Sequence, residues 1–433
     1  MLTWSKEFFR GVYLKFVEVP EPIWYGGGLT RLSFPEEWEI HVCKMEGHDA
    51  SPLSCSEMRE AFENPIGTER IRDLAKGKSE AVIIFDDMTR GTRIYEIVPY
   101  ILRELREGGI SNSHVRFVMA LGAHGARTRI DFALKLGEDI VSRFPVYNHN
   151  PFYNLVKLGK TSNGTPVELN AEVERCDLKI GVGSIVPHPM TGFGGGSKII
   201  LPGVVSIDTM YHNHVVLGNY VSGRKPHPSL GLGVDVEKNV VFRDMEEAAV
   251  MSGLDVKVDA LLNCRSETTR LFVGDPVEEF RAGVEVAKKH YVTKPLREPD
   301  IVVVNVTAKS NEAVLSLWPG LRYLKKGGTI VVVANTPEGQ VTHYLYGKFG
   351  MNHGGPGWAP KSDEHPYGKL IVYSKYVEAD PHLEIASRKD MVWMKRWSDV
   401  LTELKRIHGE EAKVAVYPCC EIQYPPGGIP CSK

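Results

Sequence analysis

A glycine-rich segment over residues 185–198 holds the densest group of side chains that could carry chemistry. It reads Ile-Val-Pro-His-Pro-Met-Thr-Gly-Phe-Gly-Gly-Gly-Ser-Lys and follows an apolar run that is typical of a buried strand. Glycines let backbone N–H groups approach an anion closely, and the amine of Lys198 adds a positive charge. A P-loop is excluded, because that motif requires Gly-Lys-Ser/Thr and here Ser197 separates Gly196 from Lys198.

Three histidines accompany this segment. His188 lies inside it, and His212 and His214 follow Lys198 within 16 residues. A glycine turn with a solvated lysine is the simpler alternative, but imidazoles can transfer protons near neutral pH and can bind metals. Their presence around the lysine therefore favours a functional site.

Polar residues also follow two earlier apolar runs. The sequence Asp-Met-Thr-Arg, ending at Arg90, follows the run at 81–85, and Gly-Ala-His, ending at His124, follows the run at 115–120. An arginine can bind a carboxylate through two parallel hydrogen bonds. Taken alone, however, the first of these segments is more simply a helix cap with solvated arginines.

The ends of three consecutive predicted strands thus present Arg90, His124 and His188. The arginine could hold an anion, and the two histidines could act as general bases. The combination indicates proton transfer at a carboxylate substrate, and histidines on opposite faces of one carbon would suit a racemase. These residues do not identify a cofactor.

The elements that must position these residues alternate along the chain. Short apolar runs at 81–85, 115–120 and 178–185 alternate with stretches of helical apolar spacing at 94–107 and 130–144. This alternation predicts a mostly parallel α/β sheet, which binds ligands at the carboxyl ends of its strands.

The same alternation resumes in the second part of the chain. A helix is predicted over 276–291, followed by further strand-like runs and a helix over 393–408. We therefore predict two α/β domains with mostly parallel sheets: an N-terminal cofactor-binding domain over 1–275 and a C-terminal domain over 276–433. The active site is expected in the cleft between them.

Composition and charge exclude several classes of protein. The 433 residues contain 52 Lys+Arg and 54 Asp+Glu, so the net charge of −2 provides no general attraction to nucleic acid or to anionic membranes. No apolar run approaches the ~20 residues that span a bilayer, and no signal peptide is visible. Seven scattered cysteines without a CxxC pair fit a cytoplasmic protein.

Residues 20–220 resemble the lactate racemase family, whose enzymes use a nickel-pincer nucleotide. The motifs that carry the resemblance appear in order and at family-like spacings: Tyr25-Gly26, Asp87-Met88-Thr89-Arg90, Gly122-Ala123-His124, Asn148-His149, the stretch 177–203 and Asn213-His214. The resemblance implies an isomerase, a racemase or epimerase of a small 2-hydroxy acid. It also implies dependence on the separate proteins that build the cofactor.

The resemblance further implies how the cofactor is held. This pyridinium-3-thioamide-5-thiocarboxylic acid mononucleotide would be attached covalently to Lys198, and nickel would be bound by the ring carbon, two sulfurs and His214. His212 is the less favoured ligand. Gly194, Gly195 and Gly196 would let the backbone approach the cofactor. Imidazole suits nickel in a planar site with sulfur donors. Asp87 and Thr89 would be its neighbours on the cofactor or substrate side.

By the same resemblance, His124 and His188 are the acid/base pair and Arg90 binds the substrate. One histidine would take the hydroxyl proton while hydride leaves the α-carbon for the cofactor, giving a planar 2-keto acid. Return of hydride to the other face would invert the centre. A family tryptophan that binds substrate corresponds to Trp397, with Trp393 as the alternative.

One difference from the family's lactate enzymes concerns the C-terminal domain. Ser316 and Pro319 stand where those enzymes carry a Gln and a Lys three residues apart, and neither can replace the lost charge. Lys309 or Arg93 could supply it instead. We therefore expect a 2-hydroxy acid other than lactate, such as a sugar acid or an aromatic acid.

The same residues allow three other interpretations. A phosphate-ester or nucleotide-dependent transferase would use the loop at 192–198 as an anion cradle. A cofactor carrier or sensor would keep Lys198 but would not need His124 and His188, which are both present. A zinc hydrolase is disfavoured because the chain has no HExxH motif.

Overall fold

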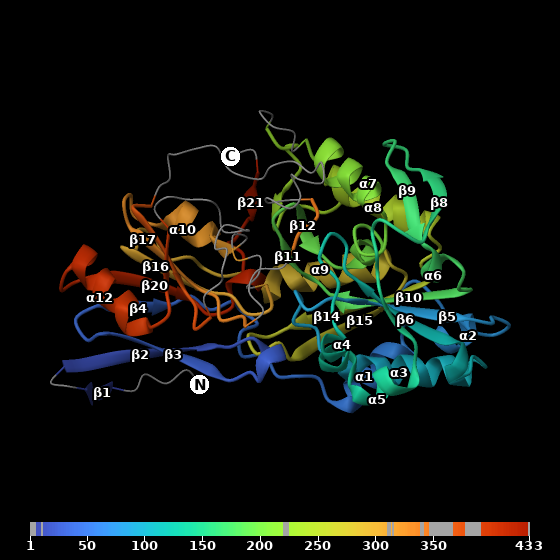
Figure 1. The fold of residues 1–433 in the computed structure, drawn as a ribbon, viewed down its shortest axis with the longest axis horizontal. Coiled ribbons are helices and arrows are strands. Elements are labelled where there is room, and N and C mark those ends of the chain that lie inside the picture. Colours follow the sequence, from blue (N-terminus) through green and yellow to red (C-terminus); the bar gives the residue numbers. More distant parts are fainter. Residues whose placement is uncertain are drawn as a thin grey trace. The chain divides into compact units, whose positions relative to one another are not determined.

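The computed structural model describes residues 6–9, 12–219, 225–309, 313, 316–337, 342–345, 367–376 and 391–431. Its contacts divide the chain into two compact units. The central unit contains Gly47–Tyr291, Thr342–Gly357 and Gly427–Lys433. The terminal unit contains Met1–Glu46, Val292–Val341 and Trp358–Pro426. Figure 1 shows the elements of both units.

The central unit is built on a six-stranded sheet with the order β15-β14-β10-β5-β6-β7. Neighbouring strands run parallel except for the antiparallel pair β14 and β15. All residues of β5 and β10 are buried, as expected for central strands covered on both faces. The strands are β5 Ala81–Asp86, β6 Val115–Ala120, β7 Val146–Asn148, β10 Leu178–Ser184, β14 Val256–Leu262 and β15 Thr268–Gly274.

Amphipathic helices cover this sheet. The apolar spacing of α3 places Ile94, Ile97, Ile101 and Leu105 in one core with residues of β5 and β6, as the sequence predicts. In Figure 1, α1, α3 and α5 lie together beside these strands. The helices of this unit are α1 Cys55–Glu63, α2 Ile71–Leu74, α3 Ile94–Glu107, α4 Arg129–Leu136, α5 Glu138–Arg143, α6 Ala171–Glu174, α7 Ile207–Tyr211, α8 Val240–Met251 and α9 Glu278–His290.

The glycine-rich segment forms a hairpin of a second, smaller sheet. Strands β11 Val186–His188 and β12 Thr191–Gly194 pair antiparallel, and the hairpin leads into the short 3-10 helix η3 Gly196–Ile199. The sheet is completed by β13 Gly231–Leu232 and β21 Ile429–Pro430. A separate hairpin, β8 Leu155–Lys160 with β9 Pro166–Asn170, belongs to the same unit.

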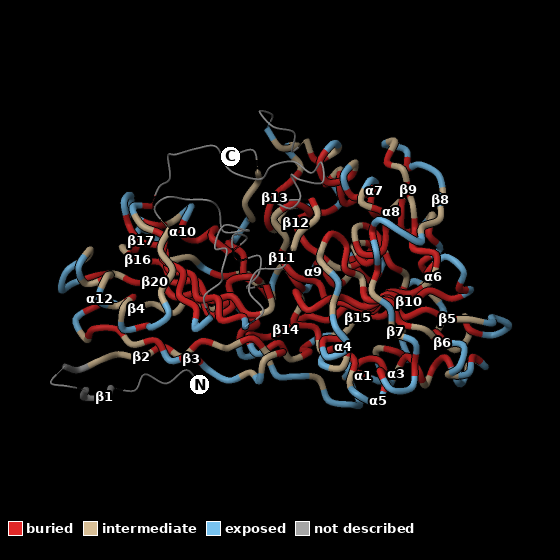
Figure 2. Tube along the Cα trace, viewed as in Figure 1, coloured by how far each residue is buried: buried red, intermediate tan, exposed pale blue. Residues whose placement is uncertain are grey.

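The terminal unit contains a second six-stranded sheet, in the order β19-β18-β17-β16-β20-β4, with every neighbouring pair parallel. The predicted α/β class with mostly parallel sheets is therefore confirmed. Figure 2 shows that the inner strands of both large sheets are buried. The elements are β1 Lys6–Phe9, β2 Val12–Pro20, η1 Ile23–Tyr25, β3 Leu29–Pro35, β4 Glu39–Val42, β16 Ile301–Asn305, α10 Trp318–Tyr323, β17 Thr329–Val333, β18 Lys369–Tyr373, β19 Met391–Met394, α12 Trp397–His408, β20 Lys413–Tyr417 and η6 Cys420–Ile422.

These units differ from the predicted domains, 1–275 and 276–433, at the first 46 residues, at α9 and at the two stretches Thr342–Gly357 and Gly427–Lys433, which group with the central unit. β4 adds to the edge of the terminal sheet beside β20, and Phe34 and Trp38 are buried in the core of that unit, so the first 46 residues group with the C-terminal part. Helix α9, predicted to open the second domain, packs on β14 and β15 of the central unit. Pairing between strands hundreds of residues apart leaves no local pattern in a sequence.

Among the residues that the structure describes, none of the helices is long and apolar enough to cross a membrane.

Candidate active site

Three parallel strands of the central unit bring the predicted site residues to one edge. β5 lies between β6 and β10, and all three run in the same direction. Asp87 follows β5, His124 follows β6, and β10 leads into the hairpin that carries His188. The carboxyl ends of parallel strands are where such sheets bind ligands.

Asp87 and His124 form a hydrogen-bonded pair at this edge. Asp87 Oδ2 lies 2.6 Å from Nδ1 of His124, and both side chains are largely buried. Burial alone would raise the pKa of Asp87. The charge and hydrogen bond of His124, with the charges of Arg127 and Arg90, instead hold that pKa well below its usual range. An ionised Asp87 accepts the Nδ1–H of His124, so Nε2 is the nitrogen that can take a proton.

The other oxygen of Asp87 holds the turn that carries Arg90. Asp87 Oδ1 accepts hydrogen bonds from the backbone N–H of Thr89, at 3.0 Å, and from its hydroxyl, at 2.6 Å. Arg90 Nη1 donates to the Thr89 hydroxyl at 2.8 Å. The hydroxyl of Thr89 is thus engaged within the turn, and its side chain is fully buried. Its predicted contact with a cofactor stays a prediction.

Lys135 is a member of this site that sequence reasoning missed. It lies on α4, fully buried, with its Nζ 2.8 Å from Asp86 Oδ1 and 2.8 Å from the carbonyl oxygen of Arg90. Thr92 donates to the other oxygen of Asp86 at 2.6 Å. This buried ion pair supports the turn from beneath. A lysine in an amphipathic helix normally lies on the solvated face, so the sequence around Lys135 did not indicate that it is buried.

His188 has the opposite hydrogen-bond arrangement to His124. Its Nδ1 accepts from the backbone N–H groups of Met190, at 3.2 Å, and Thr191, at 3.3 Å. A proton on Nδ1 would face two N–H donors, so these contacts assign the neutral ring with its hydrogen on Nε2. The two predicted acid/base residues are therefore not equivalent: His124 presents a proton acceptor at Nε2, and His188 presents a hydrogen-bond donor there.

The three consecutive glycines before Lys198 serve different purposes. Gly196 donates its N–H to Asp259 Oδ2 at 2.6 Å, and a Cβ there would lie 2.7 Å from the Phe280 ring. A Cβ on Gly195 would lie 3.0 Å from the same carboxylate oxygen. These two glycines face the protein interior. Their predicted cofactor contacts are untested, and the N–H of Gly196 is already used, which weakens the anion-cradle interpretation.

Gly194 instead lies beside the predicted reactive side chains. A Cβ at this position would be 3.8 Å from Cδ of Lys198 and 3.9 Å from Cδ2 of His188. Lys198 and His188 therefore approach the same small glycine. A Cβ there would make ordinary van der Waals contacts, so Gly194 marks the place where these two side chains come near each other.

His214 lies in a π-helical turn, η4 His212–Leu217, directly after α7. Such turns occur frequently at functional sites. The ring is buried, and Nδ1 has no hydrogen-bond partner among the described residues. Burial, followed by the charges of Lys198 and His343, lowers the pKa of His214 well below its usual value. A neutral imidazole with an unpartnered nitrogen fits a metal ligand.

His212 and Asn213, which precede His214, form hydrogen bonds that hold the backbone of this turn. His212 Nδ1 lies 2.9 Å from the hydroxyl oxygen of Thr165. Asn213 donates to Asp244 Oδ2 at 2.8 Å, and Asp244 also accepts from the Thr165 hydroxyl at 2.7 Å. This network holds the π-helical turn and supports His214 over His212 as the predicted ligand.

His343 is a fourth histidine of the site and was missed by sequence analysis. It forms an isolated antiparallel bridge with His124, and the two ring centroids are 5.3 Å apart at an interplanar angle of 70°. The charge of His343 also acts on His214. No periodic pattern surrounds His343, so only the folded chain places it here.

Trp397 and Trp393, the two candidates for substrate binding, both lie in the terminal unit. Trp397 is 8% exposed, donates its indole N–H to the carbonyl of Ser33 at 2.7 Å, and packs against Phe34 and Tyr373. These contacts describe a core residue, and its substrate binding stays a prediction. Trp393 lies on β19.

The residues that stand at the positions of the family's Gln and Lys are buried, whereas Arg93, one of the two possible substitutes, is half-buried. Ser316 is fully buried, and Pro319 lies in the first turn of α10. Lys309 is also buried. Arg93, in the central unit, donates to the carbonyl of Arg265 at 3.0 Å and pairs with Glu96 at 3.3 Å. These two contacts hold the side chain of Arg93 near the start of α3.

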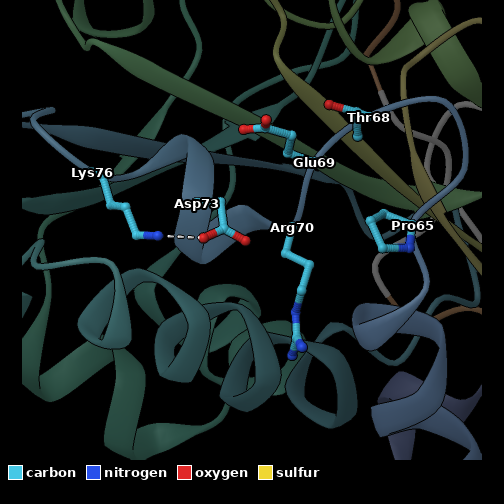
Figure 3. Close-up of a pocket in the computed structure, with 6 residues that line it drawn as sticks. All are labelled: Pro65, Thr68, Glu69, Arg70, Asp73 and Lys76. Atoms are coloured by element: carbon cyan, nitrogen blue, oxygen red, sulfur yellow. Dashed lines mark hydrogen bonds and ion pairs between the residues drawn. The ribbon is translucent and has the colours of Figure 1, made fainter.

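A surface pocket of the central unit lies elsewhere. Figure 3 shows its lining, in which Lys76 and Asp73 form an ion pair at 2.6 Å. None of the predicted site residues lines it. The residues are Pro65, Thr68, Glu69, Arg70, Asp73 and Lys76. Their mixture of charges points to no particular ligand.

Comparison with known proteins links this chain to one family. A family model described as the lactate racemase N-terminal domain matches residues 25–223. The lactate racemase of Thermoanaerobacterium thermosaccharolyticum is 30% identical over 332 residues, covering 75% of this chain and 75% of that protein. The lactate racemase of Lactiplantibacillus plantarum is 28% identical over 289 residues, covering 65% of this chain and 66% of that protein.

Solved structures share the fold. The lactate racemase apoprotein of T. thermosaccharolyticum has a TM-score of 0.69 at 24% identity, covering 94% of this chain and 99% of that chain. A crystal structure of a protein from Thermotoga maritima has a TM-score of 0.63 at 19% identity, covering 86% and 98% of the respective chains. At these identities the likeness concerns the fold alone.

Proposed function

This chain belongs to the lactate racemase family, and we propose that it is a racemase or epimerase of a 2-hydroxy acid. The observation that carries the proposal is the Asp87–His124 pair at 2.6 Å, at the same sheet edge from which the His188 hairpin leads. An ionised carboxylate that orients an imidazole is the arrangement of a general base. A second histidine with the opposite tautomer offers a hydrogen-bond donor at Nε2.

Two observations support a nickel-pincer nucleotide as the cofactor. His214 offers a buried, neutral imidazole whose Nδ1 lacks a partner in the described part of the chain, and the charge of Lys198 acts on it. Lys198 would hold the cofactor covalently and His214 would bind the nickel. When bound, this group supplies an acceptor that takes hydride from the substrate α-carbon and returns it to either face.

The side chains of this chain would supply binding and proton transfer. Arg90 binds the substrate carboxylate through its guanidinium group. His124 takes the hydroxyl proton at Nε2, and the negative charge of Asp87 stabilises the imidazolium that forms. His188 holds its hydrogen on Nε2, because Nδ1 accepts two backbone N–H groups, and from Nε2 it can donate a hydrogen bond to the substrate oxygen.

We also propose that the substrate is not lactate itself. Ser316 and Pro319 offer no charge to a substrate, and both are buried in the terminal unit. A 2-hydroxy acid with a larger or more polar substituent fits this difference. The cytoplasm is the proposed location, and proteins that build the cofactor are the proposed partners.

The test is the intact mass and nickel content of the chain after co-expression with cofactor-building proteins of the family. We expect an added mass localised to Lys198, about one nickel per chain, and loss of optical rotation from one member of a panel of chiral 2-hydroxy acids. Lys198→Ala should remove both the mass and the activity, whereas Lys157→Ala, at an exposed lysine of the same unit, should remove neither. An unmodified chain beside a modified lactate racemase would contradict the proposal.

A further inference from the structure

A short segment from a distant part of the chain is docked on the loop that carries His124. Residues 342–345 follow β17 in sequence, yet they belong to the central unit. The N–H of Gly125 donates to the carbonyl of Thr342 at 3.1 Å, and the N–H of Tyr344 donates to the carbonyl of Ala123 at 2.7 Å. His343 lies between these two bonds and is thereby held opposite His124.

Aromatic packing strengthens this attachment. The ring of Tyr344 meets the ring of Phe152 edge to face, with centroids 5.0 Å apart. Leu345 is buried at the end of the segment. Backbone bonds on both sides of His343, together with the apolar contacts of Tyr344 and Leu345, mean that the position of its ring is set by the central unit itself.

Hydrogen bonding fixes the tautomer of His343. Its Nδ1 accepts the backbone N–H of Leu345 at 3.2 Å. The neutral ring therefore carries its hydrogen on Nε2 and is a donor there. His124 has the reverse arrangement, because its Nδ1–H is given to Asp87 and its Nε2 is the acceptor. The two rings, whose Nε2 atoms have complementary roles, meet edge to face with their centroids 5.3 Å apart.

We propose that His343 is a catalytic residue that donates a hydrogen bond from Nε2 to the substrate oxygen whose proton His124 removes. This inference rests on the function proposed above. The hydroxyl proton moves to Nε2 of His124, the electron pair of the O–H bond stays on the oxygen, and His343 stabilises the negative charge that develops there. Fixed donors directed at developing charge are among the strongest contributions to catalysis.

This role differs from simple packing in its consequences. If His343 only supported the His124 ring, any flat ring of similar size would serve. If its Nε2–H is required, a side chain that keeps a donor at that distance should serve better than an aromatic ring without one. Phenylalanine and glutamine at position 343 separate these cases, because the first keeps the ring and the second keeps an N–H donor.

The experiment compares His343→Phe and His343→Gln in enzyme loaded with cofactor, using the substrate that the wild-type chain turns over. We expect kcat to fall roughly 100-fold in the Phe variant, as for loss of one oxyanion donor, and to stay within about tenfold in the Gln variant. The attached mass and nickel content should be unchanged in both variants. Equal activity of the two variants, or wild-type activity in the Phe variant, would overturn the inference.

A second measurement separates this inference from the proposed function. Nitrogen-15 NMR of histidine-labelled, unloaded protein should show His343 with an unprotonated Nδ1, and the opposite tautomer would overturn the inference alone. A loaded wild-type chain that turns over no 2-hydroxy acid would instead overturn the proposed function, and with it the role of His343.

Discussion

The two six-stranded sheets of this chain use the carboxyl ends of their strands in different ways. In the terminal unit, Glu421 accepts the N–H groups of Thr307 at 2.9 Å and Ala308 at 3.2 Å, as well as the Thr307 hydroxyl. In the central unit, Asp87 orients an imidazole instead. A buried carboxylate that binds backbone N–H groups holds a loop, whereas one that binds a histidine prepares it for proton transfer.

The same contrast occurs between histidines of the central sheet. His149 follows β7, and its ring is satisfied on both sides, by the carbonyl of Val205 at 2.8 Å and the amide of Asn170 at 3.1 Å. His124 has a carboxylate on one side and meets another histidine ring edge to face. A histidine that follows a strand can therefore have a structural role or be a candidate for catalysis. Its hydrogen-bond partners distinguish the two cases.

The largest effect is expected from removing the proposed nickel ligand. His214→Ala should reduce nickel from about one per chain to near zero, because its imidazole is the proposed protein donor. His212→Ala is the matched control: its ring is bonded to Thr165, and the variant should keep most of the nickel. Metal analysis of purified protein is the measurement. Equal nickel in both variants would assign the metal to another residue.

The next effect concerns the carboxylate that orients His124. Asp87→Asn should lower kcat by on the order of 10³–10⁴, since the imidazolium loses its counter-charge and the ring can adopt the wrong tautomer. The attached cofactor mass should be retained. Steady-state kinetics at saturating substrate would check this, and a loss of less than tenfold would place Asp87 among the structural carboxylates.

Removal of the matching carboxylate in the terminal unit should affect stability instead. Glu421→Ala leaves two buried N–H groups and a hydroxyl without their acceptor, which should cost about 3 kcal/mol of unfolding free energy. Turnover at a temperature well below the unfolding transition should stay within about twofold of wild type. Urea denaturation and kinetics on the same preparation test this, and a large drop in kcat would erase the contrast between the two carboxylates.

A further effect is a pH dependence from the structural histidine, which reaches its full size only at low pH. Burial lowers the pKa of His149 from 6.5 to about 4. The unfolded chain binds this proton near pH 6.5 and the folded chain only near pH 4, so stability should fall by up to about 3 kcal/mol as pH drops through that window. His149→Gln should show less of this fall in urea titrations between pH 7 and 4.5. Identical slopes would show that other groups cause it.

Local signals were sufficient to predict the sheet edge and most of its residues. Apolar runs marked β5, β6 and β10, and the polar residues after them, including Asp87 and His124, lie together as the strand order requires. The alternation of strands and helices likewise predicted the α/β class. These inferences depend on short stretches of chain, in which the spacing of apolar residues is visible in the sequence.

Long-range contacts account for what could not be predicted. Residue 343 meets residue 124, and β4 pairs with β20, through contacts that leave no mark on the neighbouring sequence. The role of Gly196 was also hidden, because its packing against Phe280 and its bond to Asp259 depend on elements that come later in the chain. A glycine-rich motif predicts that another group approaches the backbone closely, but it does not identify that group.

The composition of the central unit from three stretches of chain has a consequence for its biosynthesis. On the ribosome, the loop with His124 emerges long before residues 342–345, which bring His343, and before β21, which pairs with β13. The small sheet that carries His188 is therefore complete only once residue 430 has been made. A fragment ending at Tyr291 would contain Lys198 and both predicted acid/base histidines, yet it would lack His343 and the last strand of that sheet.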